Sequence, residues 1–498
     1  MQNEPMQNAQ GTRKLGRTVA AMLVHGGGLI ANLVLARMLT PAVWGLFIAI
    51  VSANQTLYRL TNIGGGQQER LSETSLDTDG LTQADLAGAA LLATGVLASC
   101  ALALSIVLAR PIADFFGAPE LQTWMFAAGI GAAAQFATGY GSAALSGSGN
   151  FLGVTLVSTV ASAIYLLLLG AAMTVGFHEL WTAVAAFLIV QLGSALWSVA
   201  RGLRLQKRLG MTPSFAHGRP ARLQVMRFGL TRYLMPLLPA LALFVLMGEL
   251  SREAGVGALA GFCVALTLAQ LVLLSAGAVS RAFTGASEDG VRPSEFGSHL
   301  KLVTASAIVT MLAVAALAPD ATPILFGATY APAVDSVFIA LMAAGIQAVK
   351  QAMLAGIVSK RRAPLALLDS IVSAAAVLPL GFRLIPDYGL GGLLIAQGLS
   401  EAASAALLLA IVVWRFWRET PLRDAAAAGA ALAFALAATA AGHWTAESDI
   451  HLSVFTLFLE AALFIGAYGL IGRSERERII LSLRDLLPFA RAAPGRSK

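Results

Sequence analysis

Apolar segments long enough to cross a lipid bilayer fill nearly the whole chain, and no other feature restricts the possible fold as strongly. About fourteen segments of roughly 18–28 residues can be marked, and a helix that crosses the hydrocarbon core needs about 20. Hydrophobic residues make up 57% of the chain and charged residues only 12%. Backbone polar groups in lipid must be satisfied inside the segment, and barrel strands are much shorter than these segments. We therefore expect an all-α polytopic membrane protein with about fourteen transmembrane helices.

The expected spans follow one another through short connections. The longest connections, at about 65–84, 201–227 and 281–299, all fall on one side of the membrane. Span boundaries carry an error of several residues, because the ends of helices are the least distinct part of a sequence pattern. In chain order the expected spans are 18–37, 42–64, 85–109, 121–145, 152–176, 180–200, 228–248, 256–280, 300–318, 333–357, 364–382, 389–414, 424–441 and 452–472.

Lysine and arginine are distributed unequally between the two sides that these spans define. With the N-terminus placed in the cytoplasm, 27 of the 34 lysines and arginines fall on the cytoplasmic side and three fall inside spans. The four on the outer side are Arg37, Arg110, Arg252 and Arg383. Because cytoplasmic loops carry an excess of basic residues, both termini are predicted to be cytoplasmic. The net charge of +7 then reflects these loops and does not indicate a nucleic-acid partner.

Short sequence matches suggest that the chain partly repeats itself. Phe-Gly-Ala at 116–118 recurs at 326–328, Ala-Ala-Gly-Ile at 127–130 recurs at 343–346, and Gln55 corresponds to Gln270. Each match is short, but they share their order and a nearly constant offset. Six spans, an even number, separate the copies, so both copies have the same orientation in the membrane. This is the arrangement of transporters built from two parallel repeats.

The repeat divides the chain into parts. We expect an N-terminal six-helix lobe at 1–200, a basic cytoplasmic linker at 201–227 and a C-terminal six-helix lobe at 228–415. Two additional transmembrane helices are expected within 416–472, followed by a cytoplasmic tail at 473–498. Two lobes around a central cavity favour alternating access, in which one lobe rocks against the other.

Polar and ionisable residues lie inside several spans, where they are candidates for function by default. The second span carries Ser52, Gln55, Arg59 and Asn62 on one helical stripe, which should line a cavity or a partner helix. Further candidates in or near other spans are His25, Arg232, Gln270, Arg281 and Lys350, and the buried carboxylates Asp369, Glu401 and Glu460.

Two segments resemble a known family. Leu-Ala-Arg-Met-Leu-Thr-Pro-Ala-Val-Trp-Gly-Leu-Phe at 35–47 is similar to the Ala-Arg-x-Leu-(Ser/Thr)-Pro turn and aromatic-Gly pair of the Wzx-type polysaccharide flippases. These belong to the multidrug/oligosaccharidyl-lipid/polysaccharide exporter superfamily. Arg-Pro-Ile-Ala-Asp-Phe-Phe-Gly at 110–117, followed by Pro-Glu-Leu at 119–121, resembles the family's segment between helices 3 and 4. Trp44 departs mildly from the pattern, where Tyr or Phe is commoner.

The first of these segments also has a purely structural explanation. Pro41 lies early in its helix, where a missing N–H costs little. Gly45 permits another backbone to approach closely. Arg37 can extend its charged end to the outer interface. We therefore assign no substrate contact to this turn.

The resemblance implies a function. It implies a flippase of the bacterial inner membrane that moves undecaprenyl-pyrophosphate-linked oligosaccharide to the outer leaflet, alongside membrane lipids and the glycosyltransferases or polymerase of polysaccharide assembly. It also implies a cationic cavity, and a pyrophosphate in low dielectric needs compensating charge from Arg or Lys. The expected substrate-binding residues are Arg59, Arg232, Lys350, Arg281, Gln55, Gln270, Asn62 and His25.

Carboxylates could couple transport to protons. A carboxyl group in apolar surroundings can carry a proton, and Asp369, Glu401 and Glu460 are the candidates for this role. Each of them could instead pair with a neighbouring polar group. The sequence leaves both interpretations open.

Other functional classes remain as alternatives or are disfavoured. We find no phosphate-binding loop, zinc spacing or nucleophile elbow, so no catalytic residue, metal or cofactor is expected and the chain is predicted not to be an enzyme. A drug/cation antiporter of the same superfamily is the nearest rival. A membrane-embedded glycan polymerase or ligase usually needs a large outward loop, which the short connections do not provide. A non-transporting scaffold would share the same hydropathy.

Overall fold

The computed structural model describes residues 27–62, 83–147, 150–210, 212–214, 230–284, 296–357 and 363–416. Within these ranges all regular structure is helical and no strand occurs, which confirms the all-α expectation. Eight of the described helices are long and apolar enough to cross a membrane. The chain is therefore a polytopic α-helical membrane protein.

The described helices coincide with the expected spans from the second to the twelfth, and part of the first span is also helical. His25, Glu460 and the spans expected at 424–441 and 452–472 lie outside the described residues. The helices are Gly27–Met38, α2 (Pro41–Thr61), α4 (Gln83–Val107), α5 (Ala109–Phe116), α6 (Leu121–Gly147), α7 (Phe151–Val175), α8 (Leu180–Arg208), α10 (Leu230–Ala254), α11 (Ala258–Thr284), α12 (Phe296–Phe326), the 3₁₀ helix η2 (Ala328–Ala333), α13 (Val334–Ile357) and α14 (Ala363–Phe416).

Two glycines with positive φ end helical segments, one at a break that the sequence predicted and one after a helix that it did not predict. Gly389 interrupts α14 with φ 54° and ψ −125°, so α14 consists of two helical segments, as the spans 364–382 and 389–414 require. Helix α5 was not expected as a separate element. It ends at Gly117, whose φ of 62° closes the helix in the left-handed conformation. Gly117 and Gly389 thus mark two positions where one helical segment ends and the chain changes direction.

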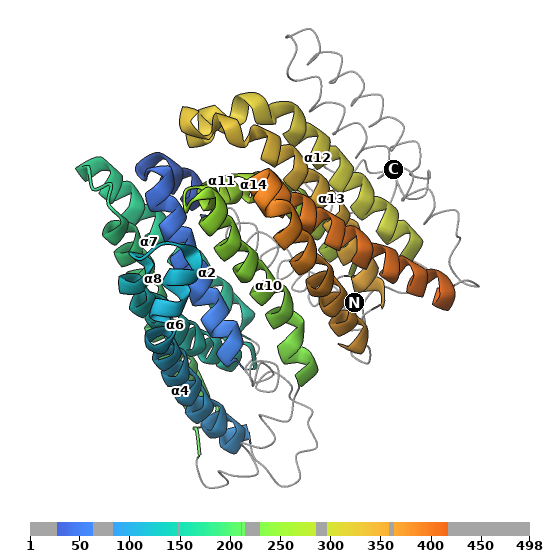
Figure 1. The fold of residues 1–498 in the computed structure, drawn as a ribbon. Coiled ribbons are helices and arrows are strands. Elements are labelled where there is room, and N and C mark those ends of the chain that lie inside the picture. Colours follow the sequence, from blue (N-terminus) through green and yellow to red (C-terminus); the bar gives the residue numbers. More distant parts are fainter. Residues whose placement is uncertain are drawn as a thin grey trace, which may run out of the picture.

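The helices pack in two groups that meet along α2 and α10. Helices α2, α4, α6, α7 and α8 contact one another, and α10 to α14 form a second set of contacts. The groups meet where α2 packs against α10 and α11, and where α5 packs against α10. Figure 1 shows the first group on the left, with α10 between it and α12, α13 and α14. The boundaries of the two expected lobes stay a prediction.

Asn54 organises the polar interior of the first helix group. Its side chain is fully buried on α2, and its amide donates to the backbone carbonyl of Ala128 on α6 at 2.9 Å. Its carbonyl oxygen accepts from the side-chain amide of Gln135 at 3.0 Å. Hydrogen bonds of this kind satisfy polar groups that lipid could not. The asparagine therefore ties α2 to α6.

We expect Asn54→Leu to destabilise the protein by about 1–3 kcal/mol, because it leaves the half-buried amide of Gln135 and the carbonyl of Ala128 without this partner. Thermal unfolding of the detergent-purified protein measures the effect. Gln122→Leu is the matched control, since Gln122 is exposed at the start of α6. Equal stability of the two variants would contradict a structural role for the Asn54 bonds.

Candidate functional site

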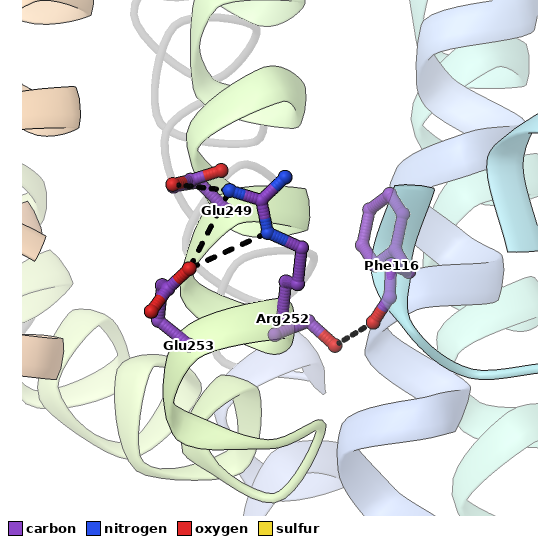
Figure 2. Close-up of polar contacts among 5 residues, drawn as sticks. Phe116, Glu249, Arg252 and Glu253 are labelled. Carbon is purple, nitrogen blue, oxygen red and sulfur yellow. Dashed lines mark hydrogen bonds and ion pairs between the residues drawn. The ribbon is translucent and has the colours of Figure 1, made fainter. Parts of the chain in front are cut away.

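One end of the bundle holds a set of contacts between the two helix groups, and the basic-residue count predicts that this end faces outward. There the hydroxyl of Ser251 on α10 donates to the carbonyl of Phe116 on α5 at 2.8 Å. Beside it, Arg252 pairs with Glu249 at 2.9 Å and with Glu253 at 3.4 Å (Figure 2). These two carboxylates hold the guanidinium against α10, so Arg252 does not bridge to α5, and the Ser251–Phe116 bond joins α10 to α5 here.

The turn that resembles the flippases contributes further contacts at the same end. The Trp44 ring meets the Tyr330 ring edge-on, with centroids 5.5 Å apart. At Gly45 an added Cβ atom would overlap the backbone carbonyl of Val256, which confirms the close approach expected there. We call this set of contacts the outer seam; its residues are Arg37, Trp44, Gly45, Phe116, Ser251, Val256 and Tyr330.

Arg37 adds an electrostatic contact to the outer seam. Its guanidinium donates to the backbone carbonyl of Leu325 at 3.1 Å and also to that of Ile324. Both carbonyls belong to the last turn of α12, where the helix dipole favours a cation. The exposed Arg37 side chain was expected to reach the outer interface, and it also caps a helix of the other group.

The polar stripe of α2 lies partly against α10. Arg59 donates through Nη1 to the carbonyl of Pro236 at 2.9 Å, and the hydroxyl of Ser52 lies 3.4 Å from the sulfur of Met247. The hydroxyl of Tyr233 donates to the carbonyl of Leu60 at 2.7 Å. The sequence stripe thus faces a partner helix, one of the two surroundings that were expected.

The other expected substrate-binding residues differ in their surroundings. Gln55 is half-buried on α2, and Asn62 is the half-buried C-cap of the same helix. Gln270 is exposed near the middle of α11. Arg232 and Arg281 belong to α10 and α11, but their side chains lie outside what the structure describes. Their role in binding stays a prediction.

Arg59 has the chemistry of an anion-binding group. Its half-buried guanidinium carries five N–H donors, and the bond to Pro236 engages one of its nitrogens. A guanidinium is always charged and matches the geometry of a phosphate. Its position between α2 and α10 places this charge where the two helix groups meet.

A second polar site is buried between α13 and α14. The ammonium of Lys350 lies 2.5 Å from a carboxylate oxygen of Glu401 and 3.3 Å from one of Asp369. The hydroxyl of Ser404 donates to the same oxygen of Asp369. The exposed fractions are 6% for Lys350, 7% for Asp369, 8% for Glu401 and 0% for Ser404, so the whole group is removed from solvent.

This group, which we call the buried ion cluster (Lys350, Asp369, Glu401 and Ser404), joins residues that the sequence treated separately. Lys350 was expected to bind substrate, and the two carboxylates were expected either to carry protons or to pair with a neighbouring polar group. In the structure the lysine charge is already compensated by the carboxylates. Sequence reasoning missed Ser404, although it follows Glu401 by three residues on one helix face.

The comparisons with known proteins give a fold. No family model matches the sequence, and the search of curated proteins finds no match. Among solved structures, the lipid II flippase MurJ in an inward closed conformation superimposes with a TM-score of 0.68 at 12% identity, over 93% of this chain and 99% of that one. An inward-facing multidrug resistance MATE family transporter of the MOP superfamily gives a TM-score of 0.57 at 16% identity, over 80% of this chain and 97% of that one.

A further solved structure agrees with these two. The MATE multidrug transporter DinF-BH gives a TM-score of 0.56 at 17% identity, over 81% of this chain and 96% of that one. The superpositions establish the fold, but at sequence identities this low they do not establish the substrate. The chain thus has a fold that is also found in a lipid II flippase and in multidrug transporters, and this agrees with its multi-pass membrane character.

Proposed function

We propose that this chain is a flippase that moves polyprenyl-pyrophosphate-linked oligosaccharide from the cytoplasmic to the outer leaflet of a bacterial inner membrane for surface polysaccharide assembly. The observation that carries the proposal is the extent of the fold match. The likeness to the lipid II flippase covers 93% of this chain, against 80% and 81% for the two multidrug transporters. In this proposal both termini face the cytoplasm and the chain acts as a transporter without catalysing a reaction.

The polar groups between the helix groups support an anionic substrate. Arg59 presents a guanidinium at the contact of α2 and α10. Gln270 adds a polar side chain that is exposed in the middle of α11, where facing water or substrate costs less than facing lipid. A pyrophosphate would accept hydrogen bonds from Arg59, and glutamine amides such as those of Gln55 and Gln270 can bind sugar hydroxyls.

Alternating access gives the outer seam a role in the proposed cycle. With the seam contacts made, the predicted outer end between α2, α5 and α10 is held together. Release of the headgroup to the outer leaflet requires these contacts to separate. The outer seam consists of one close contact between backbones, at Gly45 and Val256, and a few hydrogen bonds. These contacts can separate without unfolding either helix group.

The alternative is a drug/cation antiporter, which the two multidrug transporter matches favour. Such a transporter needs acidic groups that face a cationic drug. Here Asp369 and Glu401 are both paired with Lys350 and are buried between α13 and α14. Away from the outer seam, where the polar stripe of α2 meets α10, the described charge is that of Arg59, a cation, and this polarity supports the flippase over the antiporter.

The test of the proposal is a deletion strain in which lipid-linked oligosaccharide is followed in each leaflet. Deletion should trap the intermediate in the cytoplasmic leaflet, and wild type should release it. Arg59→Ala should lower outer-leaflet delivery about ten- to hundredfold, because a hydrogen bond to a charged group contributes about 1.5–3 kcal/mol. Arg59→Lys should retain part of the activity, since a lysine keeps the charge but loses the bidentate geometry.

Arg110→Ala is the matched control for Arg59→Ala. The Arg110 side chain is 80% exposed on α5 and pairs with the exposed Asp114, so its loss should leave delivery unchanged at equal expression. Normal delivery in the deletion strain would refute the flippase function. Trapping by deletion together with a silent Arg59→Ala would keep the function and remove Arg59 from the binding site.

A further inference from the structure

Two aromatic residues of the outer seam, Trp44 and Tyr330, bury polar atoms that have no hydrogen-bond partner. Trp44 is 0% exposed and Tyr330 is 5% exposed. Within the described residues, neither the indole Nε1 of Trp44 nor the hydroxyl of Tyr330 has a hydrogen-bonding partner. The two rings meet edge-on, but an aromatic ring is a weaker acceptor than a carbonyl oxygen. The aromatic pair therefore adds packing to the seam but forgoes the hydrogen bonds that both groups would make with water.

The aromatic pair lies across the contact that has to separate in the proposed cycle. Trp44 belongs to α2 of the first helix group. Tyr330 belongs to η2, which packs against α11, α12 and α13 of the second group. When the groups move apart at this end, both side chains lose their burial, and water reaches the indole N–H and the phenol hydroxyl. Opening thus restores two hydrogen bonds that the closed seam withholds.

Other polar groups that join the two helix groups do have partners. The hydroxyl of Ser251 donates to the carbonyl of Phe116 at 2.8 Å. Tyr233, the same residue type as Tyr330, donates its hydroxyl to the carbonyl of Leu60 at 2.7 Å. The unpaired atoms of the aromatic pair are therefore particular to this place and are not a general property of the contact between the groups.

We propose that the aromatic pair keeps the outer seam poised to open, because its two unpaired polar atoms make the closed seam less stable than its packing alone would make it. The proposal rests on the proposed transport function only in that the seam opens during transport. The close contact at Gly45 and the hydrogen bonds of Arg37 and Ser251 hold the seam closed against this bias. When two such states differ little in free energy, a modest difference in how a ligand binds them shifts the balance.

Tyr330→Phe tests the proposal, because it removes the unpaired hydroxyl and keeps the ring that packs on Trp44. The reporter is Ala118→Cys beside the seam, in a chain whose Cys100 and Cys263 are replaced by alanine. On the purified protein, its rate of labelling by a water-soluble maleimide follows the population of open seams. Tyr330→Phe should slow this labelling about five- to hundredfold, the factor that corresponds to relieving one unpaired buried hydroxyl.

Two matched variants separate this bias from ordinary packing. Thr182→Val also removes an unpaired buried hydroxyl, but Thr182 lies on α8 within the first helix group, so labelling should keep the parent rate. Tyr233→Phe removes a hydroxyl that does donate, to Leu60, and should lower the temperature of thermal unfolding. Tyr330→Phe should not lower it.

Faster labelling of Tyr330→Phe than of its parent would overturn the proposal, because the hydroxyl would then have a partner, such as a bound water, that stabilises the closed seam. An unchanged rate would overturn it as well. If Tyr330→Phe slows labelling but a deletion strain still delivers lipid-linked oligosaccharide to the outer leaflet, the role of the aromatic pair stands and the flippase function falls.

Discussion

Lys350→Met should lower the stability of the protein by about 3–5 kcal/mol, the largest loss expected of any single substitution in the described residues. The methionine fits the same space but leaves Asp369 and Glu401 buried, close together and without a cation. Two like charges at membrane depth repel each other and have no water to solvate them.

Thermal unfolding in detergent, read as loss of the monodisperse protein, measures this effect. Lys207→Met is the matched control, because Lys207 is exposed in the last turn of α8 and should tolerate the change. A triple variant with Lys350→Met, Asp369→Asn and Glu401→Gln removes all three charges and should recover much of the stability. If Lys350→Met unfolds at the wild-type temperature, the ion pairs do not stabilise the contact of α13 with α14.

Gly45→Ala should open the outer seam. The added methyl group would overlap the carbonyl of Val256, and a backbone atom cannot turn aside as a side chain can. The start of α2 must then move away from the turn between α10 and α11. Overpacking of this kind costs about 1–3 kcal/mol, which shifts the balance between closed and open seams by about five- to hundredfold.

A cysteine at Ala118, which is 4% exposed beside the seam, reports the opening. In a chain whose Cys100 and Cys263 are replaced by alanine, an impermeant maleimide should label Ala118→Cys faster when Gly45→Ala is present. Gly170→Ala is the control, because nothing lies within 4 Å of the added methyl group on α7. Labelling at the same rate with and without Gly45→Ala would show that the seam accommodates the methyl group.

The helices could be predicted because bilayer crossing is a local property. Length and hydropathy suffice to mark a span, so the expected 333–357 agrees closely with Val334–Ile357. The short helix Ala109–Phe116 escaped because it is neither long nor uniformly apolar. Gly389 separates the two segments of α14, and Arg383, which was expected on the outer side, lies between the expected spans 364–382 and 389–414.

The candidate site was harder to predict, because it depends on which helices meet. A charged residue inside an apolar span is predicted to need a partner, but the sequence does not show which residue that partner is. Lys350 and Glu401 are far apart along the chain, and only the packing of α13 on α14 joins them. The contact of Arg37 with the last turn of α12 was not predicted either, because its acceptors are backbone carbonyls, which no residue type identifies in a sequence. The close backbone contact at Gly45 could be predicted, since a glycine in a membrane helix often marks a place where another helix approaches closely.

The position of Lys350 has a consequence for how the chain enters the membrane during synthesis. Helix α13 leaves the ribosome before α14, so the ammonium reaches the bilayer while Asp369 and Glu401 are still to be made. A lysine at the centre of an inserting helix costs about 2.5–3.5 kcal/mol, and Lys350, in the second half of α13, would impose part of that cost on α13 alone. Insertion of α13 should therefore be completed together with α14, and chains that stop before Glu401 should be substrates for membrane quality-control proteases.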